Sequence, residues 1–232
     1  MADQMEVVRL RGVRKVIADR MMDSLRSTAQ LTYHADADVT DLLAKRRVWK
    51  ENGRRISLED CLIHALSGVL TEMPEFNGTS DAQSVQLSAS IDISLAISSP
   101  AGLMTPVLRG VETLDLDTLA NTRRDVVSRA LKGKLAVSEM KGGSFTLSNL
   151  GHTRVRYFTP ILNAGQIAIL GVGRLETRFV LSEDRTVGQN SFLPVSLTAD
   201  HRIVDGEPAG RFLTGLCERL EDFDETGSNA KT

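Results

Sequence analysis

Apolar positions recur along the chain with two different periods. Where one apolar residue follows another every three or four positions, the pattern predicts amphipathic helices. This period predicts helices over 13–25, 42–50, 58–73, 116–130 and 208–220. Strict alternation of apolar and polar residues, or a short β-rich run between turn residues, predicts strands. These patterns predict strands over 31–39, 85–97, 144–149, 167–172 and 193–199.

Local signals support several of these elements. Ser57 and Asp60 have the spacing of a capping box at the start of one helix, and Pro74 ends it. The segment 85–97 alternates without a break, so we expect one unusually long strand with one buried face. Strands are not regularly separated by single helices, which argues against a simple βαβ succession. We therefore expect an α/β sandwich with a mixed sheet.

Composition and charge narrow the class of protein. The chain has 232 residues, of which 41% are hydrophobic and 25% charged, as in an ordinary globular protein. We expect one domain over residues 1–222 and a flexible polar tail over 223–232. Its 28 basic and 30 acidic residues are spread along the chain, so no nucleic-acid footprint is visible. No apolar stretch approaches the ~20 residues of a membrane helix, and we expect a cytoplasmic protein.

The cysteines and histidines give little support to a disulfide or a metal site. Cys61 and Cys217 each fall on the apolar side of a helical pattern, which favours buried free thiols. The four histidines are scattered, and no Cys or His pair has ligand spacing. We therefore predict no bound metal.

Ionisable residues gather in one segment, 199–206, between a predicted strand and the last helix. A histidine there, His201, can take and return a proton near neutral pH. The plainer interpretation is a surface loop in which Asp205 and Gly206 form a turn that caps the helix. The chemistry of the segment alone leaves both interpretations open.

Resemblance to a known family changes that balance. His201-Arg202-x-x-Asp205-Gly206 resembles the His-x-x-x-Asp-Gly signature of the acyltransferase component of 2-oxo acid dehydrogenase complexes, which chloramphenicol acetyltransferases share more loosely. Further segments resemble the same family in the same order, from about Arg9 to about Leu220. They are RGVRKVIADRM, GLMTPVLRG, GGSFTLSNLG and FTPILNAGQIAILGVG.

The resemblance implies a fold and a chemistry. The expected fold is a chloramphenicol-acetyltransferase-like two-layer sandwich, with a mixed sheet flanked by helices, in a homotrimer. The active sites would lie between subunits, where His201 of one meets Ser148 of the next. His201 would deprotonate the thiol of coenzyme A or of a dihydrolipoyl group, and Ser148 would stabilise the oxyanion. Asp205 would orient the loop.

Basic residues in two segments are candidates for binding the acyl carriers. Arg14, Lys15 and Arg20 resemble the basic start of the family and are candidates for the coenzyme A phosphates, although a solvated basic face is equally compatible. Arg154 and Arg156 stand where the family is usually less basic. We hypothesise that they favour a phosphopantetheine acceptor, including one on an acidic acyl carrier protein.

The sequence also departs from the family pattern. No lipoyl or subunit-binding domain is recognisable in it, so a lipoyl-bearing protein or an acyl carrier protein on a separate chain is the expected partner. The acidic end, with no leucine cluster, predicts an isolated trimer. Two alternatives stay open: an enzyme that loads an acyl carrier protein in biosynthesis, and a scaffold without catalysis. Antibiotic acetylation is less favoured, and the acyl group is not specified.

Overall fold

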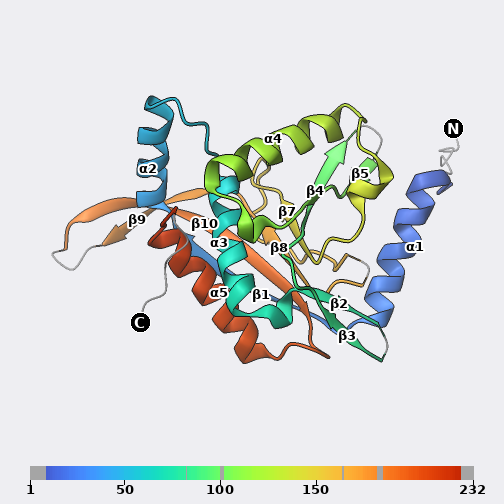
Figure 1. Cartoon of the computed structure of the whole chain (residues 1–232). Coiled ribbons are helices and arrows are strands. Elements are labelled where there is room, and N and C mark those ends of the chain that lie inside the picture. The colour runs from blue at the N-terminus through green and yellow to red at the C-terminus, as the bar shows by residue number, and fades with distance from the viewer. Residues whose placement is uncertain (1–8, 82, 100–101, 164, 182–184, 226–232) are drawn as a thin grey trace, which may run out of the picture.

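A mixed sheet forms the centre of the molecule. The computed structural model describes residues 9–81, 83–99, 102–163, 165–181 and 185–225. The strands follow the order β1-β10-β8-β7-β4-β5, while β6 pairs with β4 and β9 with β10 (Figure 1). β4, β7 and β8 are parallel to one another, and the other pairs of the sheet are antiparallel. This is the mixed α/β architecture that the sequence predicts.

The elements have the following bounds. The α-helices are α1 (Gly12–Ser27), α2 (Thr40–Glu51), α3 (Leu58–Glu72), α4 (Leu116–Leu131) and α5 (Gly206–Glu221). The short 3₁₀ helices are η1 (Pro74–Phe76), η2 (Val111–Thr113) and η3 (Val137–Met140). The strands are β1 (Gln30–Asp38), β2 (Gly78–Ser80), β3 (Val85–Leu87), β4 (Ile93–Ser99), β5 (Gly102–Met104), β6 (Val107–Leu108), β7 (Phe145–Asn149), β8 (Ala168–Val172), β9 (Glu176–Leu181) and β10 (Val187–Asp200).

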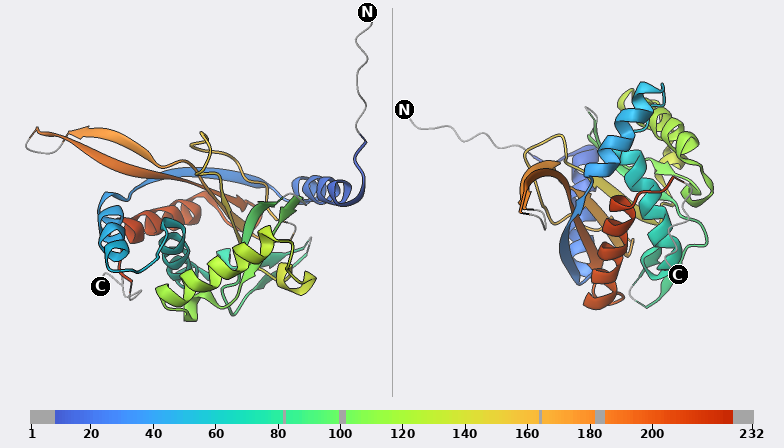
Figure 2. Two further views of the ribbon diagram at one scale, coloured as in Figure 1. Left: turned by 90° about the horizontal axis from the view of Figure 1, so that it is seen from above. Right: turned by 90° about the vertical axis from the view of Figure 1, so that its left-hand side faces the viewer.

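Helices α2 to α5 cover one face of the sheet, which gives two layers (Figure 2). The core lies between these layers, where Phe76, Phe145 and Phe212 are fully buried. The rings of Phe76 and Phe212 lie 4.5 Å apart. Within the described residues, no helix is both long and apolar enough to cross a bilayer.

Helix α1 is the exception to the packing of the other helices. It lies at one end of the sheet rather than over its face (Figure 2). The predicted apolar side is only partly covered, because Val13 is 63% exposed and Leu25 is 46% exposed. Ser24 is its one buried residue, and its hydroxyl donates to the Leu162 carbonyl at 2.7 Å. The apolar side of α1 is therefore largely uncovered within one chain.

The predicted long strand over 85–97 is wrong. The chain forms the short strand β3 and then β4, with bends between them. The side-chain amide of Asn77 donates to the carbonyls of Ser88 and Ser90, at 3.2 and 3.0 Å, and so holds these carbonyls away from a ladder. Alternation was maintained through the bend, which is why the sequence pattern did not reveal it.

The structure also extends the last predicted strand. β10 begins at Val187, six residues before the predicted start at 193, and pairs with β9, which the pattern did not predict. Residues 176–181 and 187–192 form a two-stranded ribbon that projects from the body, and we call it the arm (Figure 2).

The packed part of the chain continues beyond the predicted domain boundary. Phe223, assigned to the tail by the sequence, is 4% exposed and packs on the ring of Trp49. Lys45 donates to its carbonyl at 2.8 Å, and Arg54 pairs with Glu225 at 2.7 Å. The remainder of the predicted tail, 226–232, lies outside the described residues.

Both cysteines are buried and free, as the helical patterns predict. Cys61 lies in α3 and Cys217 in α5. Burial raises the pKa of each thiol to about 12. Each is therefore a small packed side chain and a poor nucleophile.

Candidate active site

His201 lies directly after β10, at one end of the sheet. Its backbone amide donates to the carbonyl of Ala29 at 2.8 Å, which ties it to the start of β1. Its side chain is 41% exposed, and the Nδ1 atom is 3.7 Å from Oδ1 of Asp205. Asp205 precedes α5 as its N-cap but makes no side-chain capping bond, and its side chain is 86% exposed. The imidazole is thus open to a substrate, with one carboxylate nearby.

Asp200 fixes the backbone on both sides of His201. Its side chain is fully buried and accepts hydrogen bonds from the amides of Ala29 and Arg202, each at 3.1 Å. The Arg202 guanidinium also donates to it, with Nη2 at 2.6 Å from Oδ2. Burial alone raises the pKa of this carboxyl, but the hydrogen bonds from Arg202 and the backbone outweigh it, so the pKa lies below its ordinary value. This role of Asp200 was not predicted from the sequence, although Asp200 directly precedes the candidate base.

Ser148 lies on β7, half-buried, two strands away from the strand that leads to His201. In the register of the sheet, Ser148 pairs with Gly171, and Gly171 pairs with Ser196. His201 lies five residues beyond Ser196, so it is about 16 Å away from Ser148 along the strands and about 10 Å across them. One chain therefore does not bring the predicted catalytic pair together.

A polar row crosses the sheet at the level of Ser148. Side chains of His34, Ser196 and Ser148 occupy matching positions on β1, β10 and β7. Nδ1 of His34 and the Ser196 hydroxyl are 2.9 Å apart. Gly171 supplies no side chain to the row, and Phe158 fills its place, since a Cβ at Gly171 would lie 2.7 Å from the ring. Sequence patterns do not reveal this row, because a row across strands depends on the register.

Arg154 and Arg156 lie in the loop that follows β7, the strand that contains Ser148. Their segment lies beside the end of β8, where the amide of Arg174 donates to the carbonyl of Val155 at 2.7 Å. Arg156 is not a free cation, because its Nε atom is 2.8 Å from a carboxylate oxygen of Glu176. Arg154 is exposed. Of the two predicted carrier-binding arginines, Arg154 is therefore the more available.

Arg14, Lys15 and Arg20 lie at the same end of the sheet as His201, because α1 leads into the start of β1 beside it. All three are exposed on α1, the helix that leads into β1. Lys15 forms an ion pair with Asp19 at 2.9 Å, one helical turn away. The structure thus keeps these basic residues apart from Arg154 and Arg156 within one chain.

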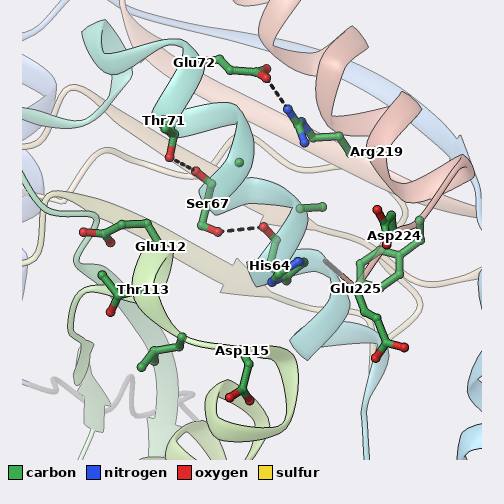
Figure 3. Close-up of a pocket in the computed structure, with 14 residues that line it drawn as sticks. His64, Ser67, Thr71, Glu72, Glu112, Thr113, Asp115, Arg219, Asp224 and Glu225 are labelled. Carbon is green, nitrogen blue, oxygen red and sulfur yellow. Dashed lines mark hydrogen bonds and ion pairs between the residues drawn. The ribbon is translucent and has the colours of Figure 1, made fainter. Parts of the chain in front are cut away.

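The cavity shown in Figure 3 does not belong to this set of residues. It has a volume of about 490 Å³ and is lined by His64 and Glu72 of α3, Arg219 of α5 and residues 112–115. Arg219 lies 13 residues beyond Gly206, which is about 20 Å along the helix and away from His201. Burial lowers the pKa of His64, which disfavours the charged form of its ring. Among the described residues, no group of three or more candidate side chains could hold a metal ion.

Comparisons with known proteins agree with the fold. Residues 2–227 match the family model of the 2-oxoacid dehydrogenases acyltransferase catalytic domain. The chain is 33% identical, over 91% of its length, to the acetyltransferase component of the mitochondrial pyruvate dehydrogenase complex of Dictyostelium discoideum. It spans 34% of that relative's length.

Solved structures give the same result. A dihydrolipoamide acetyltransferase of Azotobacter vinelandii superposes with a TM-score of 0.87 at 31% identity, covering 95% of this chain and 93% of that chain. A chloramphenicol acetyltransferase, 20% identical with a TM-score of 0.54, covers 94% of this chain and 98% of that chain and shares the fold. The predicted fold class is thereby confirmed. This chain belongs to the family of 2-oxoacid dehydrogenase acyltransferase catalytic domains.

Proposed function

We propose that this chain transfers an acyl group between a lipoyl thiol and coenzyme A, at a site shared by two copies of the chain. The observation that carries the proposal is the separation of His201 and Ser148 on one sheet. His201 is partly exposed and Ser148 is half-buried. Within one chain they are too far apart to act on the same reacting group. A second copy that brings its Ser148 to His201 completes the pair.

The chemistry follows from the two side chains. The His201 imidazole removes the proton from the attacking thiol, which is mostly protonated at neutral pH because thiols have a pKa of ~8.5. The thiolate attacks the thioester carbonyl and forms a tetrahedral oxyanion, to which the Ser148 hydroxyl of the other copy donates a hydrogen bond. Collapse breaks the original C–S bond, and the departing thiolate takes the proton back from His201. No acyl-enzyme is formed.

A serine and a histidine are also among the residues investigated for the catalytic mechanism of the Azotobacter protein, together with an asparagine four residues after the histidine. In this chain Asp205 occupies the position four residues after His201. Its carboxylate, close to Nδ1, supports the imidazolium that forms when the thiol loses its proton. Asp205 therefore has a supporting role in the proposal.

The proposed assembly is a homotrimer with three shared sites. Cyclic rings of identical subunits arise when two different surfaces of each subunit meet. In the proposal, one of these surfaces contains His201 and the other contains Ser148. The proposed partner is a protein that carries the lipoyl group. We propose that Arg14, Lys15 and Arg20 bind the phosphates of coenzyme A. The contribution of Lys15 is reduced, because its ammonium group already forms an ion pair with Asp19.

An acyl carrier protein is a less favoured acceptor. The exposed Arg154 supports it, but Arg156 is already neutralised by Glu176. If Arg154 and Arg156 can both become alanine without loss of binding to an acidic carrier protein, this role is excluded.

The test of the function is acyl transfer from acetyl coenzyme A to free dihydrolipoamide, followed as thioester formation. We expect a robust rate for the wild type and a loss of about 10²–10⁴-fold for His201→Ala. His64→Ala is the matched control, because that histidine lies away from both halves of the site. Transfer to a carrier-protein phosphopantetheine but not to lipoamide would contradict the proposal, and inactivity with every acceptor would favour the scaffold.

A further inference from the structure

The end of β7, beside Ser148, is held differently on its two sides. Ser148 is the last residue of β7 that pairs with β4, where it lies opposite Ala96. The next residue, Asn149, still pairs with Val172 of β8 on the other side. The chain then turns at residues 151–154. The position of Ser148 at the end of its strand therefore depends on what holds Asn149.

The side chain of Asn149 makes two hydrogen bonds in two directions. Its carbonyl oxygen accepts from the backbone amide of Gly151 at 2.8 Å, which closes the turn after the strand. Its amide nitrogen donates to Oε1 of Glu59, the second residue of α3, at 3.3 Å. Because side chains alternate along a strand, Asn149 shares the helix-facing side of β7 with Phe145, and Ser148 faces the opposite way. Asn149 thus connects the strand end to α3 directly behind Ser148.

Glu59 is itself held by Arg123 of α4. Nη1 of Arg123 is 3.0 Å from Oε2 of Glu59, so one carboxylate oxygen faces the arginine and the other faces Asn149. The side chains of Arg123 and Glu59 are 11% and 25% exposed, so salt screens their attraction little. The two helices are also joined without this carboxylate, because Arg123 donates to the fully buried Asp60 at 2.5 Å and to the Ser57 hydroxyl at 2.9 Å. The bond from Asn149 to Glu59 therefore adds a contact to β7.

We propose that Glu59 and Asn149 are positioning residues for Ser148 in the shared site. The inference rests on the proposed function, in which the Ser148 hydroxyl donates to the oxyanion. Such a donor must be held within about 0.5 Å of its productive position. Arg123 and Glu59 fix the side chain of Asn149, and Asn149 fixes the backbone next to Ser148. Loss of the bond between Glu59 and Asn149 is expected to move the hydroxyl without removing it.

Exchanging the amide for a carboxylate tests this contact. Asn149→Asp keeps an oxygen that accepts from the Gly151 amide, but its second oxygen meets the Glu59 carboxylate, so that hydrogen bond is lost. We expect kcat for transfer from acetyl coenzyme A to dihydrolipoamide to fall about tenfold, with KM little changed. Adding Glu59→Gln reverses donor and acceptor, because the glutamine amide donates to the new carboxylate while its carbonyl accepts from Arg123. We expect this double variant to recover most of the lost kcat.

A cycle with Ser148→Ala separates positioning from general damage to the fold. If Asn149→Asp acts through the Ser148 hydroxyl, it should lower kcat little further in a chain that already carries Ser148→Ala. Glu59→Ala removes the contact without placing two carboxylates together, and we expect the same loss of kcat as for Asn149→Asp. Glu72→Gln is the matched control, because Glu72 lies at the other end of α3 and pairs with Arg219 of α5 at 2.5 Å. We expect it to leave kcat unchanged.

Three results would overturn the inference. They are an unchanged kcat in both Asn149→Asp and Glu59→Ala, a double variant that recovers nothing, and an equal loss from Asn149→Asp in the chain that lacks the Ser148 hydroxyl. Each leaves the proposed function intact when Ser148→Ala is itself impaired. A Ser148→Ala chain as active as the wild type would instead contradict the proposed oxyanion role, and would overturn the inference with it.

Discussion

At the scale of single residues, the carboxylate of Asp200 connects three parts of the chain beside His201. It accepts hydrogen bonds from the start of β1 and from the backbone and side chain of Arg202. Because the carboxylate is fully buried, its charge is compensated almost wholly by these donors. In the proposed reaction Asp200 therefore acts through the position of His201, since its buried carboxylate is out of reach of a substrate.

Replacing Asp200 by asparagine is expected to destabilise the fold in a pH-dependent way. The folded-state pKa of Asp200 is depressed, so its stabilising contribution is present above the ordinary value of 3.8 and is lost as the pH falls through the lower folded-state pKa. Urea unfolding should show a less stable Asp200→Asn at neutral pH and a gap that shrinks below about pH 3.8. A gap independent of pH would show that the carboxylate charge is not what stabilises this turn.

Ser148 is expected to act on the transition state more than on substrate binding. In the proposed reaction its hydroxyl donates to the oxyanion, which exists only after attack, so its loss should lower kcat with little change in KM. We expect Ser148→Ala to lose about 10²–10³-fold in kcat in a steady-state assay. The neighbouring Thr146→Ser is a suitable control, because Thr146 bonds to Gln166 inside the protein. A change confined to KM would show that Ser148 only binds substrate.

At the scale of elements, local chemistry predicts the helices better than the sheet. The capping box of α3 is formed by the residues that signal it, with the Asp60 carboxylate accepting from the Ser57 amide at 2.7 Å. The break between β3 and β4 depends on Asn77, a residue of another segment, which no periodicity reports. β9 was missed because the arm lacks a buried face. Contacts between residues distant in sequence thus determine where strands break and which strands pair, and local patterns do not report these contacts.

Two glycines in different elements should respond oppositely to alanine. A Cβ at Gly173 would lie 1.6 Å from the carbonyl oxygen of Arg156, so Gly173→Ala must displace the segment after Ser148. Gly210, in α5, has open space where its Cβ would be. We expect Gly210→Ala to stabilise by about 0.5–1 kcal/mol and Gly173→Ala to destabilise by about 3 kcal/mol or more in urea unfolding. Equal effects would mean that the close approach at Gly173 is easily relieved.

At the scale of the whole molecule, the residues of the proposed site fall into two separate groups. His201, Asp205 and the basic side of α1 lie toward one end, while Ser148 and Arg154 lie further along the sheet toward the arm. The sequence could nominate His201 and Ser148 as candidates through the family motifs. It could not show how far apart they lie, because that distance follows from strand order and register. The proposed assembly rests on this separation.

The most direct test of the shared site is to mix two inactive chains. His201→Ala and Ser148→Ala are co-expressed in equal amounts, and acyl transfer is compared with each variant alone. In a randomly mixed ring, a site is intact when an unmodified His201 faces an unmodified Ser148, so we predict about one quarter of the wild-type rate. A mixture no more active than the two variants separately would show that both residues act within one chain, which would contradict the account.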